Sequence, residues 1–177
     1  MRPNIVILFI AFLFLPVLVF SQVKLERISL LNNKASILAP KELSKMTNEM
    51  WTLKYQKRVR PILVLTDANG EVNLIADITQ QSVSEDQLVS FKDFQLAQLK
   101  KGKPDLKILQ DGVRTINSKK VGYFKFLSKA IDQKVFNYYF FTIVDGKILF
   151  FTFNCMEKLQ TTWEKTADQI VGSLKIK

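Results

Sequence analysis

The stretch of sequence that decides the fold is residues 135–154, which read VFNYYFFTIV, then the pair Asp145-Gly146, then KILFFTFN. An Asp-Gly pair between two apolar runs is a strong signal for a tight β-hairpin, because both residues accept the positive φ angles of the turn. A strand with one face in water alternates apolar and polar residues, whereas these two runs are apolar at consecutive positions. We therefore expect a hairpin whose two faces are both covered by other parts of the chain.

Six more segments have the composition of strands and lie between turn-forming residues. Asn32-Asn33 predicts a turn between the first two segments, and Asn69-Gly70 predicts a tight hairpin between the third and the fourth. The six strands are expected at residues 27–31, 35–39, 61–66, 72–79, 106–116 and 121–127.

Three segments space their apolar residues by three or four positions, which predicts amphipathic helices. Pro40 suits the first turn of the first helix. Ser84-Glu85-Asp86-Gln87 forms a capping box for the second helix, which Gly102 ends. The predicted apolar stripes are Leu43, Met46, Met50 and Leu53 in the first helix, Leu88, Phe91 and Leu99 with Phe94 and Leu96 in the second, and Leu159, Trp163, Ala167 and Ile170 in the third. These elements predict an α+β fold in which an antiparallel sheet of about six strands is covered by helices on both faces, that is, an α/β/α sandwich.

Residues 1–21 have the architecture of a secretory signal peptide. Arg2 precedes an uncharged run over residues 5–20, which is shorter than the about 20 apolar residues that a membrane-spanning helix needs. We expect export and cleavage near Ser21/Gln22, which would leave the protein periplasmic or secreted. The alternative interpretation is an uncleaved N-terminal anchor.

Residues 22–177 are expected to form a single domain, since no repeat, low-complexity tract or Pro/Gly/Ser-rich linker interrupts them. Cys155 is the only cysteine of the chain, so the domain can form no intramolecular disulfide. Its stability must therefore come from packing. The sequence does not define an oligomeric state.

The chain is basic, with 26 Lys and Arg residues against 16 Asp and Glu residues and an isoelectric point near 9.7. Attraction to an anionic partner, such as phospholipid headgroups, is therefore physically allowed. Most of the cations are scattered among acids, which is typical of an ordinary solvated surface and does not favour nucleic acid. Two groups are concentrated. One is Lys100-Lys101-Lys103, and the other, the expected centre of an anionic-surface or peripheral membrane contact, consists of Lys54, Lys57, Arg58 and Arg60.

The chain contains no histidine. This excludes Ser-His-Asp and Cys-His catalysis and histidine-ligated zinc or iron. Glycine-rich phosphate-binding motifs are also absent. Asp77, Glu85 and Asp86 lie at a predicted strand end and helix start, where capping roles account for them better than a glycosidase pair does. We therefore assign no catalytic, cofactor-binding or metal-binding residue, and we predict that the protein is not an enzyme and has no cofactor.

Two further patterns have a structural and a functional interpretation. Cys155 precedes the last predicted helix, where a thiol can have a lowered pKa, but without an adjacent base a buried small hydrophobe is the better interpretation. Asp67 to Glu71 resembles the start of a calcium-binding loop. Positions six and twelve of that loop would hold Val72 and Ile78 instead of the required Gly and Glu, which favours a hairpin turn.

The aromatic residues between Tyr138 and Phe153 also have two interpretations. They are best explained as core, since each buries a large apolar area. Under an incompletely covered sheet they would instead line an apolar patch able to bind a lipid or peptide. Tyr138 and Tyr139 point to opposite faces of one strand, so only one of them could belong to such a patch.

The order of elements resembles the PsbP-like superfamily, which includes PsbP, the bacterial envelope protein DcrB and a yeast Ran-binding import factor. The resemblance extends from about Ile28 to Ile176, and its three marks are Ser36-Ile37-Leu38-Ala39-Pro40, the hairpin from Leu65 to Asn73, and the C-terminal run WEKTADQIVGSLKI over residues 163–176. It implies an α+β fold and a docking or accessory role without catalysis, and the chain would be an exported bacterial member. No site residue of the family is carried over.

The sequence therefore predicts an exported, non-catalytic binding or accessory protein of the cell envelope. Its partner would be another protein or an apolar ligand. The alternative from a different class is a periplasmic hydrolase of unrecognised type, using a carboxylate or Ser/Lys chemistry.

Overall fold

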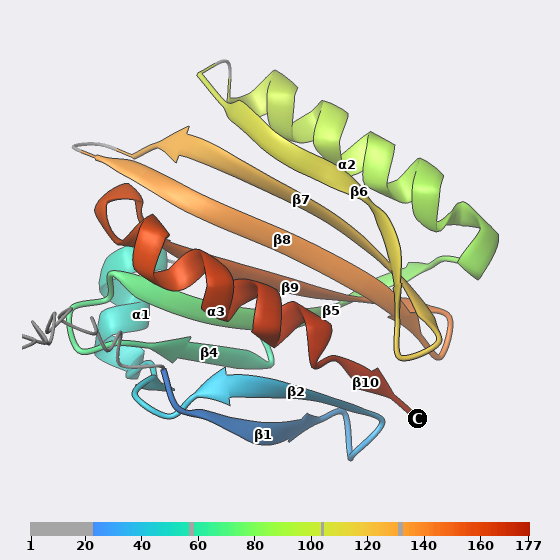
Figure 1. Cartoon of the computed structure of the whole chain (residues 1–177), viewed down its shortest axis with the longest axis horizontal. Coiled ribbons are helices and arrows are strands. Elements are labelled where there is room, and N and C mark those ends of the chain that lie inside the picture. The colour runs from blue at the N-terminus through green and yellow to red at the C-terminus, as the bar shows by residue number, and fades with distance from the viewer. Residues whose placement is uncertain (1–22, 57–58, 104, 131–132) are drawn as a thin grey trace, which may run out of the picture.

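The computed structural model describes residues 23–56, 59–103, 105–130 and 133–177, and the predicted signal peptide at residues 1–21 lies outside this range. The described residues form the strands and helices seen in Figure 1. The strands are β1 (Leu25–Leu30), β2 (Ala35–Pro40), β3 (Ser44–Lys45), β4 (Leu63–Thr66), β5 (Val72–Ser82), β6 (Lys107–Ile116), β7 (Lys119–Lys129), β8 (Lys134–Val144), β9 (Lys147–Met156) and β10 (Lys175–Ile176). The helices are α1 (Asn48–Tyr55), α2 (Leu88–Gly102) and α3 (Gln160–Gly172), with 3₁₀ turns at Glu85–Gln87 and Glu157–Leu159. None of the helices in the described ranges is long and apolar enough to cross a membrane.

Seven strands form one antiparallel sheet in the order β3-β4-β5-β9-β8-β7-β6. The four strands from β6 to β9 follow one another in the chain, as the sequence predicted. Asp145 and Gly146 have φ angles of 51° and 72°, which confirms the tight hairpin between β8 and β9. The hairpin predicted around Asn69-Gly70 is confirmed as β4–β5.

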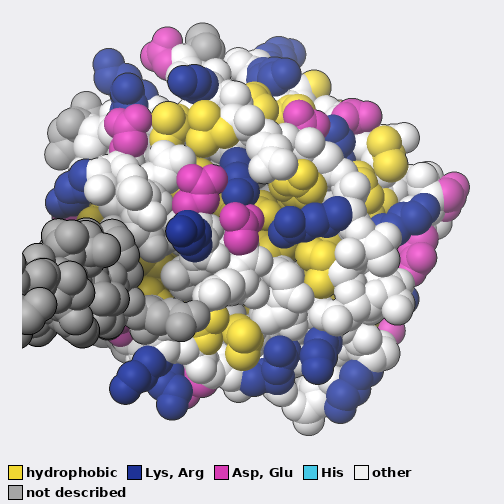
Figure 2. Space-filling view, viewed as in Figure 1, with side chains coloured by type: hydrophobic (Ala, Val, Ile, Leu, Met, Phe, Trp, Pro, Cys, Tyr) yellow, Lys and Arg dark blue, Asp and Glu magenta, His cyan; other side chains and the backbone are white. Residues whose placement is uncertain are grey.

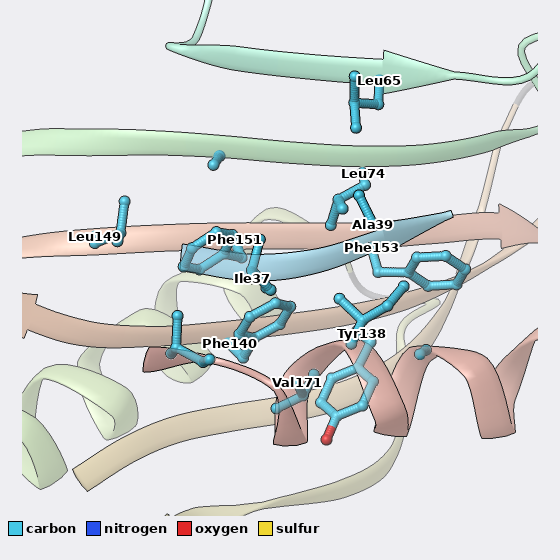
Figure 3. Close-up of a cluster of buried hydrophobic side chains, with 14 of the residues drawn as sticks. Ile37, Ala39, Leu65, Leu74, Tyr138, Phe140, Leu149, Phe151, Phe153 and Val171 are labelled. Atoms are coloured by element: carbon cyan, nitrogen blue, oxygen red, sulfur yellow. The ribbon is translucent and has the colours of Figure 1, made fainter. Parts of the chain in front are cut away.

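A second, three-stranded sheet of order β1-β2-β10 packs with α3 against one face of the large sheet. Figure 1 shows α3 in front of β8 and β9, with β1 and β2 beside it. The cluster between these layers contains side chains with no exposed area, and Figure 3 shows several of them side by side: Ile37, Phe140, Phe151 and Phe153.

The opposite face of the large sheet is covered at one end by α2. Phe91 of α2 meets Phe141 of β8 edge to face, with ring centroids 5.1 Å apart, and Phe124 and Phe126 of β7 lie in the same buried cluster. At the other end Trp51 of α1 packs in a third buried cluster with residues of the β3–β4 region. The consecutive aromatic residues of β8 and β9 are thus in contact with protein on both sides.

The predicted fold class is confirmed as α+β with a mainly antiparallel sheet and three helices. The predicted arrangement, one sheet of about six strands between helices, is not what the structure has. The strands form two sheets of seven and three strands, and the smaller sheet supplies part of the cover. The reason is that β2 pairs with β1 on one side and with β10 on the other, and neither β1 nor β2 pairs with the edge of the large sheet.

The first predicted helix is wrong over its first half. Leu43 and Met46 are buried, but there the chain is extended, and the Met46 N–H donates to a backbone carbonyl of β4 at 3.0 Å. Helix α1 begins only after Thr47, whose hydroxyl oxygen accepts from the Met50 N–H at 3.1 Å. Leu53, the last residue of the predicted stripe, is 84% exposed. Pairing of β3 with β4 satisfies the backbone here, so tertiary contact overrides the helical spacing.

Two smaller expectations are also wrong. Pro40 ends β2 and does not begin a helix. Phe94 is 56% exposed on the outer side of α2, and Leu88, Phe91 and Leu96, with Leu99 beside them, pack between that helix and the sheet.

Candidate functional site

The basic cluster predicted from the sequence is only partly described. Lys54 donates from Nζ to the carbonyl oxygen of Gly70, and burial lowers the pKa of Lys54, an effect that Asp67 partly opposes. Lys57 and Arg58 lie outside the described residues. The structure therefore shows one of these cations tied to the β4–β5 turn.

Arg60 is tied to the start of α1. Its guanidinium donates to the backbone carbonyl of Met46 and, at 2.7 Å, to Oδ1 of Asn48. It also lies 5.8 Å from the ring centre of Trp51, within cation–π range. Lys54 and Arg60 thus have intramolecular roles, and contact of the four-residue cluster with an anionic surface remains a prediction.

A second group of charges was not predicted from the sequence. Lys125 projects from the middle of β7 toward α3 and is only 6% exposed. Its Nζ lies 3.2 Å from Oε1 of Glu164 and 3.0 Å from Oδ1 of Asp168, two acids spaced by four residues on one face of α3. The ammonium also lies 4.8 Å from the ring centre of Tyr138. These four residues form the ion cluster beneath α3.

The hydroxyl of Tyr138 extends this ion cluster towards β6. In Figure 3 its oxygen points away from the other labelled core side chains. Arg114 donates to it from a guanidinium nitrogen at 2.8 Å and lies 5.0 Å from the ring centre of Tyr123. Burial raises the pKa of Tyr138; Arg114 opposes this effect and Asp168 adds to it, so the phenol stays protonated.

The charged side chains of the ion cluster form ion pairs with one another. Burial alone would raise the pKa of Glu164, but hydrogen bonds from Gln160 and Lys125 outweigh it and hold the pKa below its usual value. Glu164 is therefore ionised at neutral pH and pairs with the ammonium of Lys125. Three surface hollows near the small sheet are lined by other residues and by no member of this cluster. The arrangement fixes α3 on the sheet, with Lys125 buried and the side chains of Glu164 and Asp168 36% and 45% exposed at the surface.

The environment of Cys155 confirms the prediction of a buried small hydrophobe. Its side chain has no exposed area and lies in the main core cluster. Burial raises the pKa of the thiol to about 12, with a smaller contribution from Glu164. At neutral pH the nucleophilic thiolate is therefore almost absent.

The Asp67 segment is the predicted hairpin turn. One carboxylate oxygen of Asp67 accepts from the backbone N–H groups of Glu71 at 2.7 Å and Val72 at 3.1 Å, which closes the β4–β5 connection. Across the described ranges, no group of three or more Cys, Asp or Glu residues is placed so that it could hold a metal ion.

The surface hollows lie around the small sheet. One of about 440 Å³ lies on its outer side and is lined by Arg27, Ser29, Asn33, Ala35, Ser36, Asn117, Lys175, Ile176 and Lys177. We call this hollow the basic basin. A second hollow, of about 500 Å³, is lined by Val23, Lys24, Leu25, Leu38 and Gln169. Figure 2 shows basic and acidic side chains interspersed over the middle of this face of the molecule.

Comparison with known proteins finds likeness in structure only. No protein-family model matches the chain, and no curated protein matches it in sequence. Cyanobacterial PsbP (CyanoP) from Synechocystis sp. PCC 6803 is similar with a TM-score of 0.62 and 12% identity, covering 88% of this chain and 94% of that one. LpqN of Mycobacterium tuberculosis, involved in cell envelope biogenesis, is similar with a TM-score of 0.59 and 9% identity, covering 86% and 91%. The Saccharomyces cerevisiae Ran-binding protein Mog1p is similar with a TM-score of 0.52 and 10% identity, covering 88% and 96%.

These similarities cover most of both chains, so they compare whole domains. At such low identity they carry the fold and not the function, because one fold supports unrelated sites. They agree with the resemblance stated from the sequence marks. The chain therefore has the PsbP-like fold.

Proposed function

We propose that the chain is an exported, non-catalytic binding or accessory protein of the cell envelope. Two of the structurally similar proteins support this assignment. LpqN, which is involved in cell envelope biogenesis, supports a role in the envelope, and Mog1p, a Ran-binding protein, supports a binding role. The N-terminal sequence supports export, with cleavage near Ser21/Gln22 to a periplasmic or secreted form.

The observation that carries the proposal is the closed interior of the domain. The aromatic residues that could have lined a ligand cavity, including Tyr138, Phe140, Phe151 and Phe153, have no exposed area. Beneath α3 the titratable groups pair with one another. A domain whose aromatic interior is filled and whose buried Lys125 is paired acts through its outer surface, as a binding module does.

Export is tested by mass spectrometry of the protein recovered from cell fractions. We expect a chain that begins at or near Gln22 in the periplasmic or secreted fraction. Recovery only of the full-length chain, still carrying Met1, would contradict cleavage and support the N-terminal anchor.

Binding is tested by cross-linking in the intact envelope. A photoreactive phenylalanine analogue is placed singly at Leu53, Phe94 or Thr115, three exposed positions on α1, α2 and β6. A specific partner covers one side of the domain, so we expect adducts from one or two positions and none from the rest. Equal adducts from all three would indicate random collision and would contradict the proposal.

The hydrolase alternative is separated from the binding module by a variant. Glu164→Gln combined with Asp168→Asn removes both carboxylates of the ion cluster. A binding module should keep its pattern of adducts as long as circular dichroism shows a folded protein. Hydrolytic activity in the wild type that this folded variant lacks would favour the enzyme.

A further inference from the structure

The outer face of the small sheet carries an ordered row of donor side chains. Strand β2 lies between β1 and β10, and in the register Ser29 faces Ser36 while Ser36 faces Lys175. Alternation along the strands places these three side chains on the same face. Two hydroxyl groups and an ammonium group therefore form a line across the three strands.

Arg27 completes this row, and its position is fixed. One nitrogen of its guanidinium donates at 3.1 Å both to Oγ of Ser36 and to the carbonyl oxygen of Ser173. A guanidinium carries five N–H donors, so others remain for a ligand. Asn117, from the β6–β7 turn, is held in the same way by donating from Nδ2 to the carbonyl oxygen of Leu174 at 2.7 Å.

The lysines of the basin have no comparable structural role. Within the described ranges, no ion pair involves Lys175, Lys177 or Arg27. Lys34, by contrast, lies in the turn between β1 and β2 and is paired with Asp145 at 2.5 Å. The basic basin also has no carboxylate side chain in its lining. Three cationic residues thus line one hollow, and none of them has an ion pair within the described ranges.

The surface view agrees with this arrangement. Figure 2 shows dark-blue side chains gathered at the lower right, where Figure 1 places β1, β2 and the C-terminal strand, with no magenta side chain among them. Elsewhere on this face the two signs are mixed. The small sheet therefore has a local excess of positive charge over a surface with ordered hydrogen-bond donors.

We propose that the basic basin binds a phosphoryl group. The inference rests on the proposed binding function and names the chemistry of one ligand. A phosphate monoester carries nearly two negative charges at neutral pH and three acceptor oxygens, which suit three cations and two hydroxyls arranged around one hollow. A carboxylate has two oxygens and one charge, and would leave part of this donor set without a partner.

The phosphoryl group can be free or part of a lipid headgroup, and the neighbouring hollow allows the two sources to be distinguished. Leu25 and Leu38 line that hollow, and Leu38 is the cross-strand partner of Arg27. Leu38 is two residues from Ser36 of the basin along β2. An acyl chain attached to a phosphate in the basin would therefore contact these leucines. Inorganic phosphate would not reach them.

The experiment is an NMR titration of the ¹⁵N-labelled protein, purified as the cell processes it, at constant ionic strength. The probes are inorganic phosphate and, separately, soluble dihexanoyl phosphatidic acid. We expect saturable amide shifts confined to residues 27–36, 117 and 174–177. Additional shifts at Leu25 and Leu38 with the lipid alone would identify a lipid as the source, and shifts at the basin alone with both probes would identify a free phosphoryl ligand.

A matched pair of variants separates a site from general attraction. Lys175→Gln with Lys177→Gln removes two charges of the basin, and Lys100→Gln with Lys101→Gln removes two exposed charges at the end of α2. Because charge-assisted hydrogen bonds are lost only in the first variant, we expect it to bind phosphate at least about tenfold more weakly and the second to bind as the wild type does.

Three results would overturn the inference: no saturable shift with either probe, equal weakening in both variants, or stronger shifts with a poly-glutamate peptide at matched charge. The cross-linking test of the binding function uses other surfaces and does not depend on this outcome. A protein that forms specific adducts in the envelope but shows no phosphate shifts would keep the proposed function and lose the phosphoryl site.

Discussion

The ring of Phe141 on β8 packs directly over the backbone of Gly122, its cross-strand partner on β7. A Cβ atom added to Gly122 would lie 2.6 Å from Cζ of that ring, much closer than a van der Waals contact. Phe141 is itself fully buried and meets Phe91 of α2 and Phe150 of β9. Because Gly122 has no side chain, the Phe141 ring can lie over it and contact Phe91 of α2.

Gly122→Ala should therefore destabilise the domain. The Phe141 ring cannot move without disturbing its aromatic neighbours, so we expect a loss of about 1–3 kcal/mol, the usual range for overpacking a core. The measurement is the urea midpoint of unfolding. Gly102→Ala is the matched control, since no atom lies within 4 Å of its added Cβ, and it should be neutral or slightly stabilising. Equal midpoints for the two variants would show that the ring yields freely.

Trp163→Ala should have a larger effect. Trp163 is 7% exposed, in agreement with its place in the predicted apolar stripe of the third helix. Its ring lies beside that of Phe153, with ring centroids 5.9 Å apart. Truncating a buried large aromatic side chain costs about 3–5 kcal/mol. Thr162→Ala, an exposed change on the same helix, should stay within about 0.5 kcal/mol of the wild type. An unchanged melting temperature for Trp163→Ala would mean that α3 does not dock through this face.

The contrast between α3 and α1 shows what the sequence could predict. Trp163 and Ile170 lie inside α3, and the strand that follows, β10, pairs with β2 only beyond the end of the helix, so their spacing predicts burial correctly. Leu43 and Met46 have the same spacing, but their segment borders a strand that pairs with β4, and pairing decides the backbone. The spacing of apolar residues predicts which side chains are buried. It cannot predict that a segment pairs with a strand about 20 residues further along the chain.

The ion cluster could not be predicted for a related reason. Lys125 is one of several lysines in its strand, and Glu164 and Asp168 are four residues apart on a helix, an ordinary solvated pattern, so the sequence singled out none of the three. Only the packing of α3 on β8 and β9, within reach of the Lys125 side chain of β7, brings the three charges together. The sequence therefore indicated that no known catalytic motif is present, but not where the buried charges lie.

Lys125→Met should be destabilising in a pH-dependent way. The variant keeps the apolar stem but loses both ion pairs, and because the two acids keep part of their hydration, we expect a cost of about 1–2 kcal/mol at pH 7. Glu164 has a pKa below its usual 4.5 in the folded protein, so its stabilising effect is present above that value and is lost as the pH falls through the folded pKa. The difference between variant and wild type, measured by urea unfolding, should therefore shrink between pH 7 and pH 3. A difference that is constant or grows on acidification would contradict the pairing.

Cys155 should be unreactive in the folded protein. With the pKa of the thiol raised to about 12 and the side chain fully buried, iodoacetamide at pH 7.5 should leave the native chain unmodified while labelling it fully in urea. Mass spectrometry of the intact protein checks both states. Rapid native labelling would show that the strand end at Cys155 opens to solvent.

The final prediction concerns the basic cluster at Lys54, Lys57, Arg58 and Arg60. Because Arg60 holds the start of α1, Arg60→Gln should lower stability by about 1–2 kcal/mol, and Lys100→Gln, an exposed change of equal charge, should not. Vesicle and DNA sedimentation should show binding only at low salt, since exposed charges are screened beyond about 8–10 Å at physiological ionic strength. A folded variant neutralised at all four positions should bind as the wild type does, because most of the 26 Lys and Arg residues, including those of the basic basin, lie elsewhere in the chain. Salt-resistant binding that disappears in this variant would instead establish the cluster as a contact surface for an anionic partner.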